Sequence, residues 1–109
     1  MEKLEFKVFF YALGDYSRFM ILSSLAKRDM SVGEIVSAIN IEQSNVSHHM
    51  HCLLNCGFVN VRKNGNKRIY KINGKVKNTV EKITEHIDAY KEDIISCGIA
   101  NKKYISKVI

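Results

Sequence analysis

The sequence predicts one mainly α-helical domain that carries a single β-hairpin. Apolar residues recur at helical spacing in four successive stretches before residue 57 and in one more after residue 74. Between these regions the pattern alternates on either side of Asn64-Gly65, which is the strongest local signal for a hairpin. A chain of 109 residues is long enough for one such domain and too short for two.

The composition is that of a folded, basic protein. With 46% hydrophobic and 26% charged residues, the chain is typical of globular domains and not of disordered ones. The net charge of +6 favours nucleic acid or a membrane surface as partner, although charge alone favours a merely soluble basic protein equally. No apolar run approaches the ~20 residues of a membrane span, and the charged start Met1-Glu2-Lys3 does not resemble a signal peptide. We therefore expect a cytoplasmic protein, where three cysteines indicate metal binding, redox sensing or packing in place of disulfides.

The first two predicted helices differ in their surroundings. Residues 2–13 are dense in apolar side chains, including Phe6 and Phe9, so this helix is expected to be buried on more than one side. A domain this small needs a partner chain to cover that surface. Asp15 is the predicted N-cap of a second helix over residues 16–26.

The next two predicted helices form a helix-turn-helix. Ser31 and Glu34 make a capping box that opens a helix ending near residue 40. Only residues 41–43 separate it from the next helix, which Ser44 is expected to cap and Gly57 to end. In such a pair the second helix reads the major groove of DNA.

The start of this second helix carries short hydrogen-bonding side chains, which suit base edges and phosphates: Asn45, Ser47, His48 and His49. The hairpin that follows, residues 58–72, has a basic tip formed by Arg62, Lys63, Lys67 and Arg68. A hairpin tip is often charged merely because it is solvated, but beside a helix-turn-helix these residues predict a wing that contacts DNA. The predicted fold is therefore a winged helix-turn-helix.

The last predicted helix starts near Lys75 and carries an apolar seam with 4-3-4-3-4 spacing: Val76, Val80, Ile83, Ile87, Tyr90 and Ile94. We interpret this seam, together with Phe6 and Phe9, as the interface of a dimer. The alternative is an amphipathic helix that covers the core of its own chain. Residues 1–95 would form the DNA-binding and dimerisation domain, and residues 96–109 a C-terminal tail.

Three blocks resemble the ArsR/SmtB family of dimeric winged-helix metal-sensing repressors: Ala12–Arg18, Ser44–His49, and the hairpin ending in Arg68-Ile69-Tyr70. The resemblance runs from about Phe9 to Tyr90. It implies a homodimer that binds a palindromic operator, represses a metal-efflux or detoxification gene, and dissociates from DNA when metal binds. It places the DNA contacts on Gln43, Ser44, Ser47 and His48, with the wing on phosphates.

Two common metal sites of that family are missing. The third-helix site would need cysteines near residues 32–35, and there are none. The last-helix site would place Asp or His at positions that hold Gly74, Val76, Ile87 and Tyr90. Cys52, Cys56 and Cys97 remain, and their spacing with the sequence from His51 to Gly57 resembles the CmtR-type cadmium and lead sensors.

Residue chemistry supports a thiolate site independently. At ~100° per residue, Cys52 and Cys56 should fall on the polar side of their helix and not in the core. Cβ atoms four residues apart lie ~5–6 Å apart, so two sulfurs can converge on one ion at ~2.3 Å, with Cys97 as the third ligand. Soft thiolates favour Cd(II), Pb(II) or As(III), whereas Zn(II) would prefer a fourth ligand such as His51 or water.

Other interpretations of the thiols stay open. The cysteines are three unrelated thiols, or they serve an As(III)/Sb(III)-responsive or a thiol-redox-responsive repressor of the same fold. An enzyme is the weakest hypothesis, because the chain has no Gly-rich phosphate loop, nucleophile elbow or His-Glu-x-x-His motif.

Overall fold

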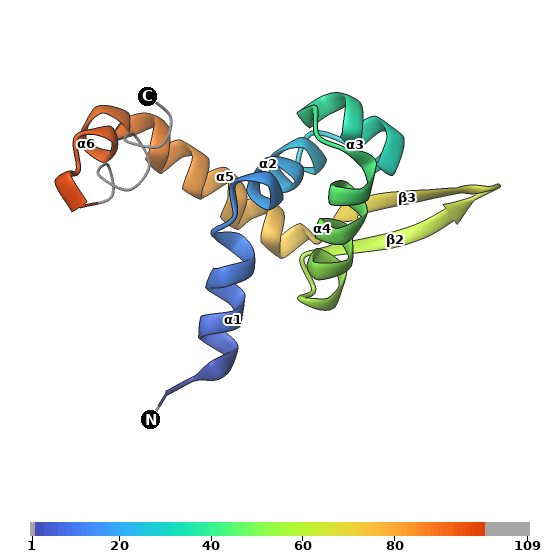
Figure 1. The fold of residues 1–109 in the computed structure, drawn as a ribbon, viewed down its shortest axis with the longest axis horizontal. Helices are drawn as coiled ribbons and strands as arrows, with labels where there is room; N and C mark the ends of the chain where they lie inside the picture. The colour runs from blue at the N-terminus through green and yellow to red at the C-terminus, as the bar shows by residue number, and fades with distance from the viewer. Residues whose placement is uncertain (1, 100–109) are drawn as a thin grey trace.

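The computed structural model describes residues 2–99, and within them it confirms the mainly α-helical winged helix-turn-helix (Figure 1). The helices are α1 Leu4–Leu13, α2 Tyr16–Leu25, α3 Val32–Ile39, α4 Gln43–Asn55, α5 Gly74–Ala89 and α6 Lys91–Ile95. The strands are β1 Met30–Ser31, β2 Val59–Asn64 and β3 Lys67–Ile72. Most of the predicted C-terminal tail, residues 96–109, lies outside the described residues.

The core forms where α2, α3 and α4 meet the base of the sheet and the start of α5. Its largest fully buried side chains come from the four helices and from Phe58, which directly precedes β2: Ile21, Leu22, Leu25, Ile35, Val46, Met50, Leu53, Phe58 and Val80. In Figure 1, α1 projects away from this body, and α5 leads in another direction to α6. Large apolar side chains of α1 are exposed, with Phe6 at 54% and Phe10 at 62%.

The sheet contains three antiparallel strands in the order β1-β3-β2. The hairpin prediction is confirmed, with Asn64 paired to Lys67 so that Gly65 and Asn66 form the turn. Gly65 has φ +66° and Asn66 is not among the residues with positive φ, which is the pattern of a type II′ turn. Strand β1 was not predicted, because two residues are too few to show an alternating pattern.

Local chain signals explain most helix ends. The Asp15 side chain caps α2 by accepting from the Arg18 N–H at 3.0 Å, as predicted. Ser31 and Glu34 form the predicted capping box of α3, and Asn40 ends that helix with a left-handed φ of 56°. The prediction that Ser44 caps α4 is wrong. The helix begins at Gln43 with no side-chain cap, and its first turn is closed by the Val46 N–H donating to the Glu42 carbonyl.

The end of α4 is fixed by a Schellman motif. Gly57 has φ +77° and donates to the Leu54 carbonyl, while the Phe58 N–H donates to the Leu53 carbonyl at 2.9 Å. Phe58 is thereby turned directly into the core at the start of the hairpin. This turn fixes the position of the wing relative to α4.

The expectation of one continuous last helix is wrong. Helix α5 ends at Ala89, Tyr90 has φ −115° and ψ 22°, and α6 begins at Lys91. The apolar seam is therefore interrupted at Tyr90, and Ile94 lies on a separate short helix. Val80 is 1% exposed in its own core, which corrects its assignment to a dimer interface.

Ser31→Ala is expected to lower the free energy of unfolding by about 1 kcal/mol, because the Glu34 amide loses its partner. The Ser31 N–H and then Arg28 lower the pKa of Glu34 from 4.5 to about 2. Because folding lowers this pKa, the ionised Glu34 carboxylate stabilises the folded state above pH 4.5. That stabilisation is lost as the pH falls towards 2. Urea denaturation checks both effects. Ser37→Ala, an exposed serine on the same helix, is the control, and equal destabilisation by both substitutions would contradict the capping role.

Candidate nucleic-acid interface and thiol site

The exposed face of α4 carries most of the side chains predicted to contact DNA. Gln43, Ser44, Asn45, Ser47 and His48 are all exposed. On the opposite side Val46, Met50 and Leu53 are buried and hold the helix against the core. Because these apolar residues fix the helix from behind, the polar row is presented as one rigid surface, with the hydrogen-bonding groups that base edges and phosphates require.

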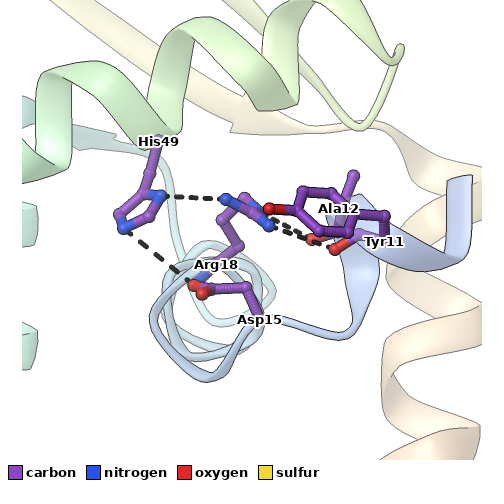
Figure 2. Close-up of polar contacts among 5 residues, drawn as sticks. All are labelled: Tyr11, Ala12, Asp15, Arg18 and His49. Carbon is purple, nitrogen blue, oxygen red and sulfur yellow. Dashed lines mark hydrogen bonds and ion pairs between the residues drawn. The ribbon is translucent and has the colours of Figure 1, made fainter. Parts of the chain in front are cut away.

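His49 differs from its neighbours on α4, because its side chain is turned inward, towards α2 (Figure 2). Its Nδ1 lies 3.3 Å from the Arg18 guanidinium, and its Nε2 lies 3.9 Å from the Asp15 carboxylate. The side chain is 16% exposed. This arrangement corrects the prediction that His49 faces DNA.

The wing places like charges opposite each other. Lys63 on β2 pairs directly with Arg68 on β3, and Asn64 pairs with Lys67 beside the turn. All of these residues are exposed. Like charges opposite each other destabilise a hairpin, so an anion bound at this tip would relieve a repulsion built into the strand register. Arg62 instead donates to the Asp29 carboxylate at 2.9 Å, which matches its charge within the chain.

Arg68→Gln is expected to weaken DNA binding and to reduce the salt slope of the binding constant by about one unit, because one phosphate contact is lost. The folded protein should be as stable as the wild type or slightly more stable, since the repulsion from Lys63 disappears. Binding measured across a salt series, together with thermal unfolding, tests both halves. Lys71→Gln on the same strand is the control, and an equal slope in the two variants would exclude a phosphate contact at Arg68.

The candidate metal ligands Cys52 and Cys56 lie at the C-terminal end of α4. Both are half-buried and pack against the core, which corrects the expectation that they occupy the polar side of the helix. A groove of about 570 Å³, lined by Leu4, Val8, Phe9 and others, reaches Cys56 between α1 and α4. Burial, and then the charge and hydrogen bond of Cys52, raise the pKa of the Cys56 thiol, while the charge of Arg18 lowers it. Cys52 and Cys56 are thus neighbours whose thiols interact.

Cys97 follows α6 and is exposed. Among residues 2–99 of one chain, no three His, Cys, Asp or Glu side chains are grouped to hold a metal ion. The structure therefore brings Cys52 and Cys56 together but does not bring Cys97 to them within a single chain.

None of the helices within residues 2–99 is long and apolar enough to cross a membrane.

Comparisons with known proteins agree with this geometry. The model of the family described as "Bacterial regulatory protein, arsR family" matches residues 15–61. The crystal structure of Rv0081 from Mycobacterium tuberculosis has a TM-score of 0.76 at 31% identity, and the match covers 88% of this chain and 100% of that one. The chain belongs to the ArsR family. It is thus a winged helix-turn-helix transcription regulator of a DNA-binding family that is not enzymatic.

Two curated relatives are named for resistance to mercury and to arsenicals. The probable mercury resistance operon repressor of Streptomyces lividans is 36% identical over 64 residues, which are 59% of this chain and 51% of that protein. The arsenical resistance operon repressor of Staphylococcus xylosus is 28% identical over 103 residues, which are 94% of this chain and 96% of that protein. This chain thus spans about half the length of the first relative and nearly all of the second.

In this ArsR-family protein, the sequence pattern did not indicate where the Arg18 side chain lies. It is 8% exposed, and from α2 its side chain bonds to α1 and α4 at once. A basic residue within an amphipathic helix is normally placed on the solvated face. The one available signal was its position three residues after the N-cap Asp15, which draws its backbone N–H to that carboxylate.

Proposed function

We propose that the protein is a homodimeric transcriptional repressor that leaves its operator when a thiophilic metal ion binds Cys52, Cys56 and Cys97. The observation that carries this proposal is the position of the thiol pair. Cys52 lies on α4 and Cys56 is its C-cap, so both belong to the helix whose exposed N-terminal half presents the DNA-contact residues. A ligand bound at the C-terminal end of α4 therefore acts directly on the orientation of the N-terminal half that contacts DNA.

In the DNA-bound form, Gln43, Ser44, Asn45, Ser47 and His48 would contact base edges and nearby phosphates. Lys63, Lys67 and Arg68 would contact flanking phosphates, which carry no sequence information but fix the register of the protein on DNA. A palindromic operator matches this arrangement, because the two copies of α4 in a homodimer are related by a two-fold axis. As a repressor of this kind the protein would act in the cytoplasm.

Thiolates select soft ions, so we favour Cd(II) or Pb(II) as the effector. Cys52 and Cys56 must lose their protons to bind such an ion, and each then supplies one negative charge. With Cys97 as third ligand the site would have three sulfur donors. Because one chain does not bring Cys97 to the other two thiols, we place its contribution across the dimer, from the partner subunit.

As(III) or Sb(III) is the second candidate effector, and the name of the Staphylococcus xylosus relative favours As(III) specifically. The name of the Streptomyces lividans relative adds Hg(II) to the thiophilic ions that need testing. Zn(II) would need a fourth ligand. A metal-free thiol-redox switch would instead link Cys97 through a disulfide, and mass spectrometry of the oxidised protein separates that mechanism from metal binding.

The test of the proposal has two arms. Selection from random double-stranded DNA with metal-free protein should enrich one palindrome, and titration with Cd(II) should generate sulfur-to-metal charge-transfer absorption. Absence of any enriched palindrome would contradict the assignment as a repressor. Absence of the absorption band for Cd(II), Pb(II) and As(III) alike would contradict metal binding by the thiols. It would leave the assignment of DNA binding unaffected.

A further inference from the structure

Arg18 is the one charged side chain buried among residues 2–99, and it joins three helices. From α2 its Nε donates to the Ala12 carbonyl at 2.6 Å and its Nη2 to the Tyr11 carbonyl at 3.1 Å, both at the end of α1. Its Nη1 lies 3.3 Å from Nδ1 of His49 on α4. Figure 2 shows this contact beside the two bonds to α1. One guanidinium therefore ties the end of α1 to the middle of α4.

The bond to His49 defines the protonation state of that ring. A guanidinium has only donors, so Nδ1 of His49 must be the acceptor and cannot carry a proton. The neutral ring then has its proton on Nε2, the atom that faces the Asp15 carboxylate at 3.9 Å. Asp15 also accepts from the Arg18 N–H, so the same carboxylate caps α2 and orients the imidazole.

We propose that Arg18 is a positioning residue for operator recognition, which holds α4 at a fixed angle to α1 through a neutral His49. The inference rests on the proposed function, because it takes α1 as part of the dimer contact and α4 as the helix that contacts DNA. Whatever fixes α4 relative to α1 then fixes the spacing of the two copies of α4 on a palindrome. Specific binding needs that spacing, whereas non-specific attraction to phosphates does not.

The link is broken by protonation of His49, because Nδ1 can no longer accept and the ring carries the same charge as Arg18. The groups facing His49 are Asp15 and Arg18 of α2 and His48 of α4. Burial lowers the pKa of His49 below 6.5, Asp15 opposes this shift, and Arg18 and His48 add to it. The ring is therefore neutral at pH 7, and specific operator binding weakens as the pH falls through this lowered pKa.

The experiment compares His49→Asn with His49→Leu. The Asn amide oxygen occupies nearly the place of Nδ1 and accepts without titrating, whereas Leu has similar bulk and no acceptor. His51→Asn is the matched control, an exposed histidine on the same helix. The readout is the ratio of operator affinity to random-DNA affinity between about pH 8 and pH 5.5, with melting temperatures measured in parallel.

At pH 8 the ratio should fall about tenfold in His49→Leu and change less than about twofold in His49→Asn and His51→Asn. On acidification the ratio should fall in the wild type and in His51→Asn and stay level in His49→Asn. The positioning role is overturned if His49→Leu keeps the wild-type ratio and pH profile. It is also overturned if the ratio falls equally in both His49 variants and their melting temperatures fall as well. That result would indicate a purely structural role for His49.

A readout without DNA separates this inference from the proposed function. Nitrogen chemical shifts of His49 in the free protein should show an unprotonated, hydrogen-bonded Nδ1 and a pKa below the ordinary value of 6.5. A wild type that binds no operator but shows this imidazole signature would defeat the repressor assignment and leave the link between Arg18 and His49 intact. A His49 pKa at or above 6.5 would defeat the link itself.

Discussion

Addition of Cd(II) is expected to lower the affinity of the wild-type dimer for its operator by about thirtyfold to more than a hundredfold, a coupling of ~2–3 kcal/mol. Cys97→Ser should bind operator as the metal-free wild type does and should lose this release. The reason is geometric: Cys97 is exposed and follows α6, which lies well apart from α4 in Figure 1. Cys52 and Cys56 are packed against the core, so only their replacement disturbs α4 itself. Fluorescence anisotropy of labelled operator, with and without Cd(II), measures the effect.

Mixed dimers test which subunit supplies Cys97. A chain with Cys52→Ser and Cys56→Ser, mixed with a chain carrying Cys97→Ser, contains one complete set of ligands only if Cys97 acts across the dimer. Release should then return in the mixture, although each variant alone is unresponsive. Equal release by the wild type and by Cys97→Ser alone would exclude Cys97 as a ligand and leave a two-thiolate site.

The metal response should also depend on pH. Burial and Cys52 raise the pKa of Cys56 above its ordinary value, so this thiol is protonated at neutral pH and must release its proton when it binds metal. Metal affinity should therefore rise with pH, by up to about one logarithmic unit per pH unit for each proton released. Charge-transfer absorption at several pH values measures this slope.

Local chain signals could be predicted from the sequence. The capping box of Ser31 with Glu34, the Asp15 cap and the glycine at Gly57 depend on neighbours within a few residues, and all three are present. Ser44 shows the limit of such reasoning. The short turn after Asn40 leads into the helix one residue earlier, and an exposed first turn does not require a side-chain cap, because water satisfies its N–H groups.

The candidate site depended on contacts between distant segments, and there the sequence was less informative. A helical wheel of α4 alone does not show that α1 covers the side where Cys56 lies. The bond between Arg18 and His49 joins residues 31 apart, so no local pattern indicates it. The break at Tyr90 was hidden for a related reason, because the apolar spacing continues through it while the backbone does not.

Dimerisation is the second property expected to respond strongly to a single substitution. Ile87 is 42% exposed and lines a groove of about 820 Å³ between α1 and α5, together with Phe10 and Ile83. Since Ile87 is not part of the chain's own core, Ile87→Glu should fold normally. Its charge would be buried without a partner wherever this groove meets a second subunit.

We therefore expect Ile87→Glu to sediment as a monomer at micromolar concentration, whereas the wild type sediments as a dimer. Operator affinity should fall by about two to three orders of magnitude, because each half-site is then bound alone and the gain from linked binding is lost. Asn78→Glu is the control: it adds the same charge on the same helix, about 180° from the seam, and should stay dimeric. The monomer should keep its melting transition and its weak, salt-dependent attraction to random DNA, since α4 and the wing are intact in each chain. A dimeric Ile87→Glu protein with full operator affinity would show that the exposed apolar surface of α1 and α5 is not where the subunits meet.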